Sequence, residues 1–386
     1  MVSKIAPPPP GVYAKDSAPL DFEVARTSVT QMNRRRFLAA AGLTAAGLAG
    51  ATSCAALRTG RGNEPWRERD IPHFDGRRFF NPDGPTGNTF SNFLKWRRTR
   101  DPAPWPELVE NTASPALPDT VRDGEVHVTL VNHCTFLIQL PGINILTDPV
   151  YSERVSPVTF AGPRRVRDPG LPWDELPRID AVVISHGHYD HLDVATLGQL
   201  NARFRPKFYT GLGNRSLLMD RGIDDVTELD WWQAAGTDAI GAKITFTPVQ
   251  HWTARTLLDR NTTLWGGFHI RQDAIDIFFG GDAGYGGEFT AIRERLGRPA
   301  LALLPIGAFK PRWFMEPSHM APDEAVKAHL DLGARQSLAM HFDTFPLADE
   351  GFGTAAEELN SARAKAGLPE TEFPAPETGS TTVITA

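Results

Sequence analysis

The chain has 386 residues, of which 41% are hydrophobic and 22% are charged. This is the composition of a globular protein that is long enough to bury a large core. The formal net charge of -6 argues against a nucleic-acid binder held by a basic surface, so no nucleic-acid partner is expected. Two cysteines are too few for a disulfide framework.

Residues 1–57 are interpreted as a disordered N-terminus followed by an export signal. Asn33 to Leu38 read N-R-R-R-F-L, and a run rich in Ala, Gly and Leu follows to Leu57. Arginines before a modest apolar run are typical of a twin-arginine leader, which predicts a periplasmic protein or one on the outer face of the inner membrane. A membrane anchor is the alternative, although Ala and Gly are weakly hydrophobic. Two questions stay open: lipidation of Cys54, and translation from Met1 or from Met32.

Residues 58–120 are rich in Pro, Gly, Arg and Trp and are expected to form an extended segment that wraps the following domain, with one short helix over 88–98. Residues 121–386 form that domain. Its β-rich runs are 126–131, 135–140, 143–146, 181–185, 207–209, 243–248, 274–279, 301–305 and 337–340. Helices are predicted over 194–201, 289–296 and 323–332. Strands that first follow one another and later alternate with helices predict a layered α/β domain with mixed sheets.

The segment Ile179 to Leu192 carries the strongest chemical pattern of the chain. A continuous apolar run, typical of a strand buried on both faces, ends in His186-Gly187-His188-Tyr189-Asp190-His191. Imidazole and carboxylate are ligands that suit Zn²⁺, and burying so many of them without a cation is costly. Gly187 permits the tight path that directs both His186 and His188 to one point. Side chains that project in two directions predict two adjacent ions.

Two ions need more ligands than one segment supplies. Three later residues also follow apolar strands: His251, Asp282 and His341. Loops at strand ends are the usual place for functional residues in α/β folds. Asp282 is the natural bridge, since a carboxylate offers one oxygen to each of two metals.

The sequence resembles the metallo-β-lactamase superfamily, whose signature is the His-x-His-x-Asp-His loop, and within it the N-acyl-phosphatidylethanolamine-hydrolysing phospholipase D branch. The resemblance extends from Phe79-Phe80-Asn81-Pro82 to Glu350. It rests on L-T-D-P at 146–149, residues 184–193, E-L-D-W-W at 228–232, Q-H-W at 250–252, residues 280–285, P-I-G-A-F-K-P-R-W-F-M at 305–315, and M-H-F at 340–342.

The resemblance implies the αββα four-layer sandwich of the metallo-β-lactamase fold, with two Zn²⁺ between the sheets and iron or manganese as substitutes. One metal would be held by His186, His188 and His251. The other would be held by Asp190, His191 and His341, with Asp282 bridging the two.

The implied activity is phospholipase D-type cleavage of N-acyl-phosphatidylethanolamine-like lipids to an N-acylethanolamine and a phosphatidic acid. Two metals activate a water for attack on phosphorus, Asp190 orients it, and His319 contacts the phosphate or acts as general acid. The other expected substrate contacts are Tyr189, Tyr285 and Ser318, and a glutamine precedes the histidine in the mammalian-type enzyme where this chain has Ser318. Peripheral membrane contact and a homodimer are compatible with this interpretation.

Two alternatives stay open: a hydrolase of a soluble phosphodiester or a lactone, and an inactive zinc-stabilised binding protein. Three further interpretations concern single residues. Asp148 either supports the ligand loop or is a plain turn aspartate, and His133 is expected to be a buried structural histidine. The tryptophans are expected in the core, in the pocket wall or on a lip that meets a membrane: Trp231, Trp232, Trp252, Trp265 and Trp313.

Overall fold

The computed structural model describes residues 64–84 and 88–385. The expected leader, Cys54 and the start-site question at Met32 lie outside the described residues. None of the helices in the described part has the length and apolar character that crossing a membrane requires.

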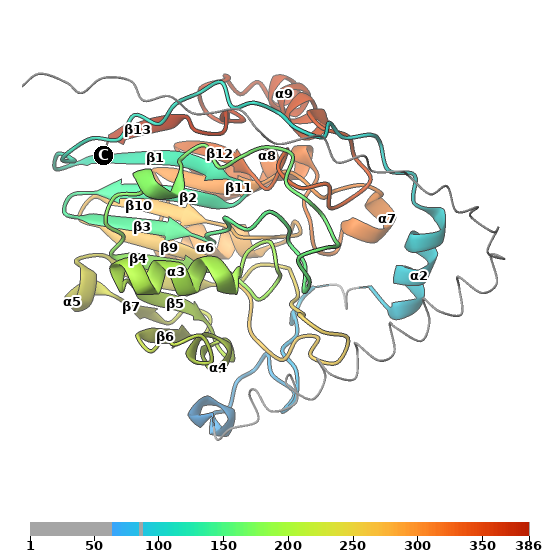
Figure 1. Ribbon diagram of the computed structural model, residues 1–386, viewed down its shortest axis with the longest axis horizontal. Coiled ribbons are helices and arrows are strands. Elements are labelled where there is room, and N and C mark those ends of the chain that lie inside the picture. The colour runs from blue at the N-terminus through green and yellow to red at the C-terminus, as the bar shows by residue number, and fades with distance from the viewer. Residues whose placement is uncertain (1–63, 85–87, 386) are drawn as a thin grey trace, which may run out of the picture. The chain divides into compact units, whose positions relative to one another are not determined.

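Two mixed sheets form the centre of the domain (Figure 1). The first has seven strands, in the spatial order β13 (Thr381–Thr385), β1 (Glu125–Asn132), β2 (Thr135–Leu140), β3 (Ile143–Thr147), β4 (Ala181–Ile184), β5 (Lys207–Gly211) and β6 (Val226–Leu229). The second has six, in the order β12 (Gln336–Met340), β11 (Leu301–Pro305), β10 (Ile275–Phe279), β9 (Gly267–Gln272), β8 (Lys243–Thr247) and β7 (Ala234–Ala235).

Helices cover the outer faces of both sheets, with α3 over the first and α6 and α8 over the second (Figure 1). The helices are α2 (Phe90–Thr99), α3 (Val194–Phe204), α4 (Arg215–Met219), α5 (Thr237–Ile240), α6 (Glu288–Leu296), α7 (Arg312–Met315), α8 (Pro322–Leu332) and α9 (Thr354–Ala366), with 3-10 turns η1 (Pro65–Glu68) and η2 (Trp173–Glu175). The expected αββα arrangement is confirmed.

Local sequence explains where the helices begin and end. The Asp193 carboxylate accepts from the main-chain N–H groups of Ala195 and Thr196, which caps the start of α3. Pro322 opens α8 as the sequence predicts, and Gly333 ends it with φ +59°. These signals are why the predicted helices over 194–201 and 323–332 lie where α3 and α8 are.

The largest part of the core includes the space between the sheets, a second part lies between the first sheet and α3, and two small clusters lie elsewhere. Alternate residues of the first sheet face opposite ways: Phe136 and Val183 pack between the sheets, whereas Leu137 and Val182 pack toward α3. A strand such as β4, buried on both faces, therefore appears in the sequence as an unbroken apolar run.

Strand direction determines which loops meet. β3, β4 and β5 run parallel, and so do β10, β11 and β12. β1 points the same way as β3, because β2 is antiparallel to both, and β8 matches β10 through β9 for the same reason. Within the first sheet the loops that follow β1, β3 and β4 therefore lie at one edge, and so do those that follow β8, β10 and β12 in the second sheet. Contacts between the loops, such as the His341 N–H donating to the His133 oxygen, bring these two edges together.

The segment before β1 packs on this domain through a few specific contacts. The Asn81 side chain donates to the main-chain oxygen of His251 at 3.0 Å, and the Trp105 indole donates to the main-chain oxygen of Glu350 at 2.8 Å. α2, expected over 88–98, packs Trp96 on Phe314 of α7. The proposed division at residues 57 and 120 stays a prediction.

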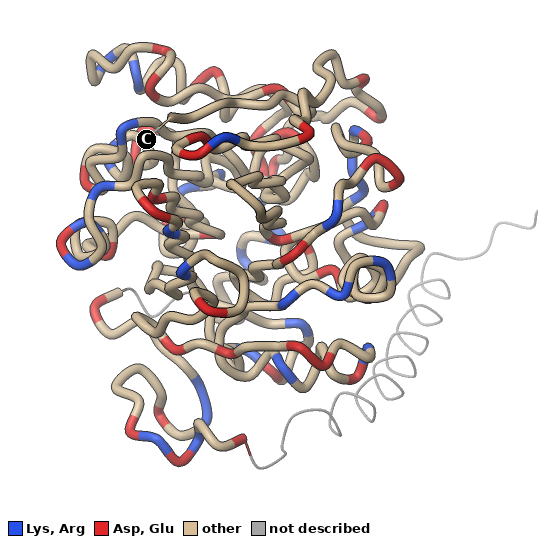
Figure 2. Tube along the Cα trace, turned by 90° about the vertical axis from the view of Figure 1, so that its left-hand side faces the viewer, with Lys and Arg blue, Asp and Glu red and all other residues tan. Residues whose placement is uncertain are grey.

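Charged residues of both signs are interspersed along the trace (Figure 2). Local groups of cations therefore matter more than net charge for binding an anion.

Candidate metal centre

The loop after β4 is fixed by a close contact with the loop after β8. The Gly187 N–H donates to Thr253 Oγ1, and a Cβ on Gly187 would lie only 2.8 Å from that oxygen. A side chain at this position would force the Thr253 side chain or the loops to shift, so glycine is favoured by close approach rather than by an unusual φ. On either side of it, His186 is buried and His188 is partly open to solvent.

Four of the predicted ligands meet in what we call the first cluster: His186, His188, His251 and Asp282. One nitrogen or oxygen of each lies within 4.8 Å of the others. His188 Nδ1 is 2.8 Å from His186 Nε2 and 3.2 Å from His251 Nε2. These side chains come from the ends of β4, β8 and β10.

The remaining predicted ligands form the second cluster, which consists of Asp190, His191 and His341. Oδ2 of Asp190 is 3.5 Å from His191 Nε2 and 3.4 Å from His341 Nε2. Asp282 lies between the clusters: its Oδ1 is 3.0 Å from His341 Nε2, and its Oδ2 is 3.3 Å from His191 Nε2 and 3.7 Å from His251 Nε2. The structure thus brings all seven residues together, with Asp282 where a bridge is expected.

Unpaired buried atoms show that this donor set fits metal ions. Within the described residues, several buried polar atoms that face the clusters have no hydrogen-bond partner of acceptable geometry: Nε2 of His191 and His341, Oδ1 of Asp282 and Nδ1 of His319. Leaving one buried donor or acceptor without a hydrogen bond costs about 1–3 kcal/mol of stability. Imidazole nitrogens and carboxylate oxygens turned toward shared points are the donors that Zn²⁺ binds.

The pKa values of the site residues also indicate that the site fits metal ions. Burial holds the pKa values of His186 and His251 well below the usual range, so both are neutral. Although burial opposes it, the pKa of His341 is raised to about 9 by Asp282 and Asp190, and that of His191 is raised well above its usual value. Without a metal, the second cluster thus takes up protons to balance its buried carboxylates, and a bound cation would replace them.

A hydrogen-bond chain beneath the site decides between the two interpretations of Asp148. This carboxylate is fully buried, and its Oδ2 accepts from His191 Nδ1 at 2.6 Å and from Ser185 Oγ at 2.5 Å. Ser185 Oγ in turn accepts from His186 Nδ1 at 2.9 Å. Asp148 therefore supports the ligand loop, leaving Nε2 of both histidines free for a metal.

Of the predicted substrate contacts, His319 places its imidazole beside the shared carboxylate of Asp282. Its Nδ1 is 3.8 Å from Asp282 Oδ2, and burial lowers its pKa to about 4. Ser318 is buried, and its main-chain oxygen accepts from His251 Nδ1 at 2.9 Å. Asp190 and His319 keep about 15% of their side chains exposed, which leaves one side of the site open to a substrate.

The two tyrosines are already engaged by other groups. The Tyr189 hydroxyl donates to the Arg255 main-chain oxygen at 2.9 Å, and the Arg255 guanidinium lies 4.0 Å above its ring. The Tyr285 hydroxyl donates to Asp331 Oδ2 at 2.7 Å. Neither hydroxyl hydrogen is therefore available to a substrate.

The tryptophans separate into core, site and surface positions. Trp265 is fully buried, Trp252 lies edge-on to His188 at 4.5 Å, and Trp313 is 42% exposed. Trp231 stacks on His73, and Trp232 lies beneath Arg295.

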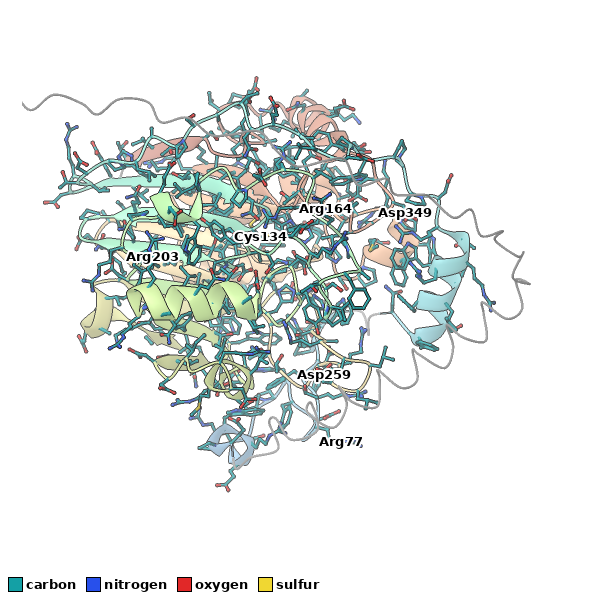
Figure 3. All side chains as sticks on the ribbon, in the orientation of Figure 1. Arg77, Cys134, Arg164, Arg203, Asp259 and Asp349 are labelled. Atoms are coloured by element: carbon teal, nitrogen blue, oxygen red, sulfur yellow. The ribbon has the colours of Figure 1, made fainter. Side chains whose placement is uncertain are left out.

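Sequence reasoning missed two neighbours of the clusters, Arg255 and Cys134, and expected a third, His133, as a buried structural histidine near the site. Arg255 donates through Nη1 to the main-chain oxygens of Gly187 and Leu192, which holds both ends of the ligand loop. Cys134, labelled in Figure 3, is fully buried near His191 and Asp282. His133, interpreted as structural, has its Nε2 3.3 Å from Asp190 Oδ2. The available signal was position, because both 133 and 134 follow a strand that ends at the site edge.

Comparison with known proteins shows which family the chain matches. Residues 143–342, which include all seven predicted ligands, match the family model of the β-lactamase superfamily domain. The chain is 38% identical to N-acyl-phosphatidylethanolamine-hydrolyzing phospholipase D 1 of Caenorhabditis elegans over 59% of this chain and 67% of that one. It is equally identical to an uncharacterized protein of Mycobacterium tuberculosis, over 67% and 72% of the two chains. Among solved structures, a metallo hydrolase of Ignicoccus hospitalis is similar, with a TM-score of 0.51 and 25% identity over 67% of this chain and 98% of that one.

Proposed function

Because this chain belongs to the metallo-β-lactamase superfamily, in the branch that resembles N-acyl-phosphatidylethanolamine-hydrolysing phospholipase D, we propose that it is a zinc-dependent phosphodiesterase. The substrate class would be N-acyl-phosphatidylethanolamine-like lipids, cleaved to an N-acylethanolamine and a phosphatidic acid. The single observation that carries the proposal is the meeting of the seven predicted metal ligands, with Asp282 between the two clusters, at the open edge of the sheets.

The residues fit two divalent cations. His186, His188 and His251 would hold one, Asp190, His191 and His341 the other, and Asp282 both. When bound, such a pair activates water near neutral pH and stabilises the charge that develops on phosphoryl oxygens.

The chain's own groups then orient the reaction. Asp190, partly open to solvent, would accept a hydrogen bond from the attacking water. His319, on the open side beside Asp282, would donate a hydrogen bond to the phosphoryl group or to the leaving alcohol. Asp148 and the Ser318 carbonyl fix which nitrogen of His191 and His251 faces the metals.

An exposed aromatic patch on α2 and α7 supports contact with a lipid surface. Trp96 is buried, whereas Phe90 is 68% exposed, and Phe93, Leu94 and Trp313 are also exposed. α2 has no acidic residue and carries Lys95, Arg97 and Arg98, with the Lys95 ammonium 4.5 Å above the Trp313 ring. Aromatic rings beside cations suit the interface of an anionic phospholipid membrane.

The test of substrate class combines metal analysis with product identification. We expect about two zinc ions per chain, hydrolysis of bis-nitrophenyl phosphate, and release of N-acylethanolamine from N-acyl-phosphatidylethanolamine in micelles, detected by mass spectrometry. Turnover of soluble esters alone would favour a soluble phosphodiester or a lactone as substrate. Two bound zincs with no turnover would favour a binding protein.

The patch has its own test. Phe90→Ser with Phe93→Ser should lower binding to vesicles containing phosphatidylglycerol and leave hydrolysis of bis-nitrophenyl phosphate unchanged. Leu330→Ser, another exposed apolar side chain, is the matched control on α8. Equal vesicle binding by all variants would remove the patch from the proposal.

Export by the twin-arginine leader is proposed on the sequence alone. Replacing Arg34 and Arg35 by Lys should retain the unprocessed precursor in the cytoplasm, which fractionation would detect. Normal processing of that variant would contradict the proposal.

A further inference from the structure

The turn between β1 and β2 places His133 against the second cluster. The residue follows β1 directly and is 3% exposed. Its φ is +46°, a left-handed conformation that residues other than glycine adopt uncommonly. A buried histidine held in this conformation beside the site needs a reason, and its contacts supply one.

The imidazole points at a carboxylate of the cluster. Nε2 is 3.3 Å from Asp190 Oδ2, and since an ionised carboxylate only accepts, Nε2 carries the proton of this bond. The ring centroid lies 4.1 Å from that of His341, and Phe345 packs edge-on at 5.3 Å. These two rings hold the imidazole plane, so the N–H stays directed at Asp190.

The main chain of the same residue holds a second member of the cluster. The His341 N–H donates to the His133 oxygen at 3.0 Å, and the His133 N–H donates to Thr344 Oγ1 at 3.1 Å. His341 also has a left-handed φ, of +60°. The two loops therefore stabilise each other's unusual backbone.

We propose that His133 is a positioning residue for the second cluster, which orients the Asp190 carboxylate through its side chain and the His341 loop through its main chain. This inference rests on the proposed two-metal function. It extends that function, because it assigns a role to a residue outside the seven predicted ligands.

His133 is as close to the second cluster as a metal ligand would be, since one of its ring nitrogens lies within 4.8 Å of ligand atoms of Asp190, His191 and His341. Positioning is favoured because His133 Nε2 already meets Asp190 Oδ2, whereas Nε2 of His191 and of His341 has no hydrogen-bond partner within the described residues. Nδ1 of His133 has no partner among the described residues. The ring is therefore anchored only through the nitrogen that meets Asp190.

The test uses His133→Met, which keeps the volume and removes the donor, and His133→Gln, whose amide N–H can replace Nε2–H. Zinc content would be measured by mass spectrometry and affinity by competition with a chelating dye. Both variants should hold two zinc ions at saturation. His133→Met should bind one of them about 10- to 100-fold more weakly, and His133→Gln should remain close to the wild type.

A double-mutant cycle with Asp190→Ala isolates the side-chain contact, since His133→Met should add no further loss in that background. Wild-type affinity in His133→Met would overturn the proposal. Loss of one whole zinc in both single variants would make His133 a ligand and also overturn it. If the Met variant does not fold, the cycle is run with His133→Asn, whose amide reaches only the Nδ1 position.

No step of this test depends on turnover. A wild-type chain that binds two zincs and cleaves no phosphodiester would overturn the proposed function and leave the metal measurements valid for His133.

Discussion

The two clusters of the site differ in charge more than in geometry. The first has three imidazoles and shares the Asp282 carboxylate, and burial keeps His186 and His251 neutral. The second adds the Asp190 carboxylate, and its histidines have raised pKa values. The comparison teaches that one metal position is prepared mainly by neutral donors and the other by negative charge, although both are built from the same strand edge.

Their supports differ as well. The second cluster has a buried carboxylate, Asp148, directly behind His191. The first is supported by neutral oxygens, Ser185 Oγ behind His186 and the Ser318 carbonyl behind His251. Because Ser185 also donates to Asp148, a single carboxylate links the two supports.

The largest effect is expected where the clusters share a residue. Asp282→Ala should weaken metal binding in both clusters and lower turnover by at least about 10³-fold, since metal catalysis supplies several kcal/mol and each 1.36 kcal/mol is tenfold. Zinc analysis and bis-nitrophenyl phosphate hydrolysis measure this. The control is Asp276→Ala, which removes a carboxylate that pairs with Arg271 and lies in β10, the strand that Asp282 follows. Full zinc content in the Asp282 variant would show that the clusters do not depend on a shared bridge.

A smaller, unequal effect is expected from the supporting carboxylate. Asp148→Asn should weaken the second cluster about 10- to 100-fold, because His191 loses its charged partner, and weaken the first cluster less. Stepwise zinc titration would measure this, with His188→Ala as the background in which only the second cluster is complete. The control is Asp180→Asn, a carboxylate that accepts from the Asn144 N–H away from the site. An equal loss of zinc affinity in both clusters would show that Asp148 does not support the second cluster in particular.

Loss of the Ser185 hydroxyl, a neutral support of His186, should lower zinc affinity least. Ser185→Ala removes one hydrogen bond from His186, which is worth about 1 kcal/mol, or roughly fivefold in affinity. The loss should fall on the first cluster, so it would be measured in an Asp190→Ala background. A loss in the second cluster as large as that of Asp148→Asn would mean that Ser185 acts chiefly through Asp148.

The fold was predictable wherever burial leaves a continuous mark on the sequence. The runs 135–140 and 301–305 coincide with β2 and β11, because every residue of these strands is buried. β9 was missed because G-F-H-I-R-Q begins at a glycine and contains His and Arg. α9 was missed because its four buried residues are two alanines, one leucine and one arginine, which form no apolar stripe.

The site was predictable from one local motif and one rule about strand ends. That rule identified His251, Asp282 and His341 without any spacing to guide it. The role of Asp148 could not be decided, because a turn aspartate and a supporting carboxylate look alike until the 2.6 Å contact with His191 is known. The contact of His133 with the second cluster could not be predicted, because it depends on the direction of β1. That direction follows from pairing with β2 rather than from composition.

Glu228, a carboxylate that belongs to neither cluster, provides the smallest test of the comparison. Glu228 is partly buried in β6, accepts from the Arg215 N–H at 2.9 Å, and has no histidine partner within the described residues. Burial raises its pKa to about 7 from 4.5, whereas the histidines hold the pKa of Asp282 well below its usual range. Partners, not burial alone, therefore decide whether a buried carboxylate here is ionised.

The sign of the pH effect follows from the raised pKa. Between about pH 4.5 and 7 the folded chain holds a proton on Glu228 that the unfolded chain has lost, so its contribution to stability is full below pH 4.5 and is lost as the pH rises through 7. Glu228→Gln keeps an acceptor for Arg215 and cannot ionise. Urea unfolding at pH 5 and pH 8 should show the wild type losing about 1–3 kcal/mol relative to this variant. Asp225→Asn, at the exposed start of the same strand, is the control, and parallel curves for wild type and Glu228→Gln would show that Glu228 stays ionised without a histidine.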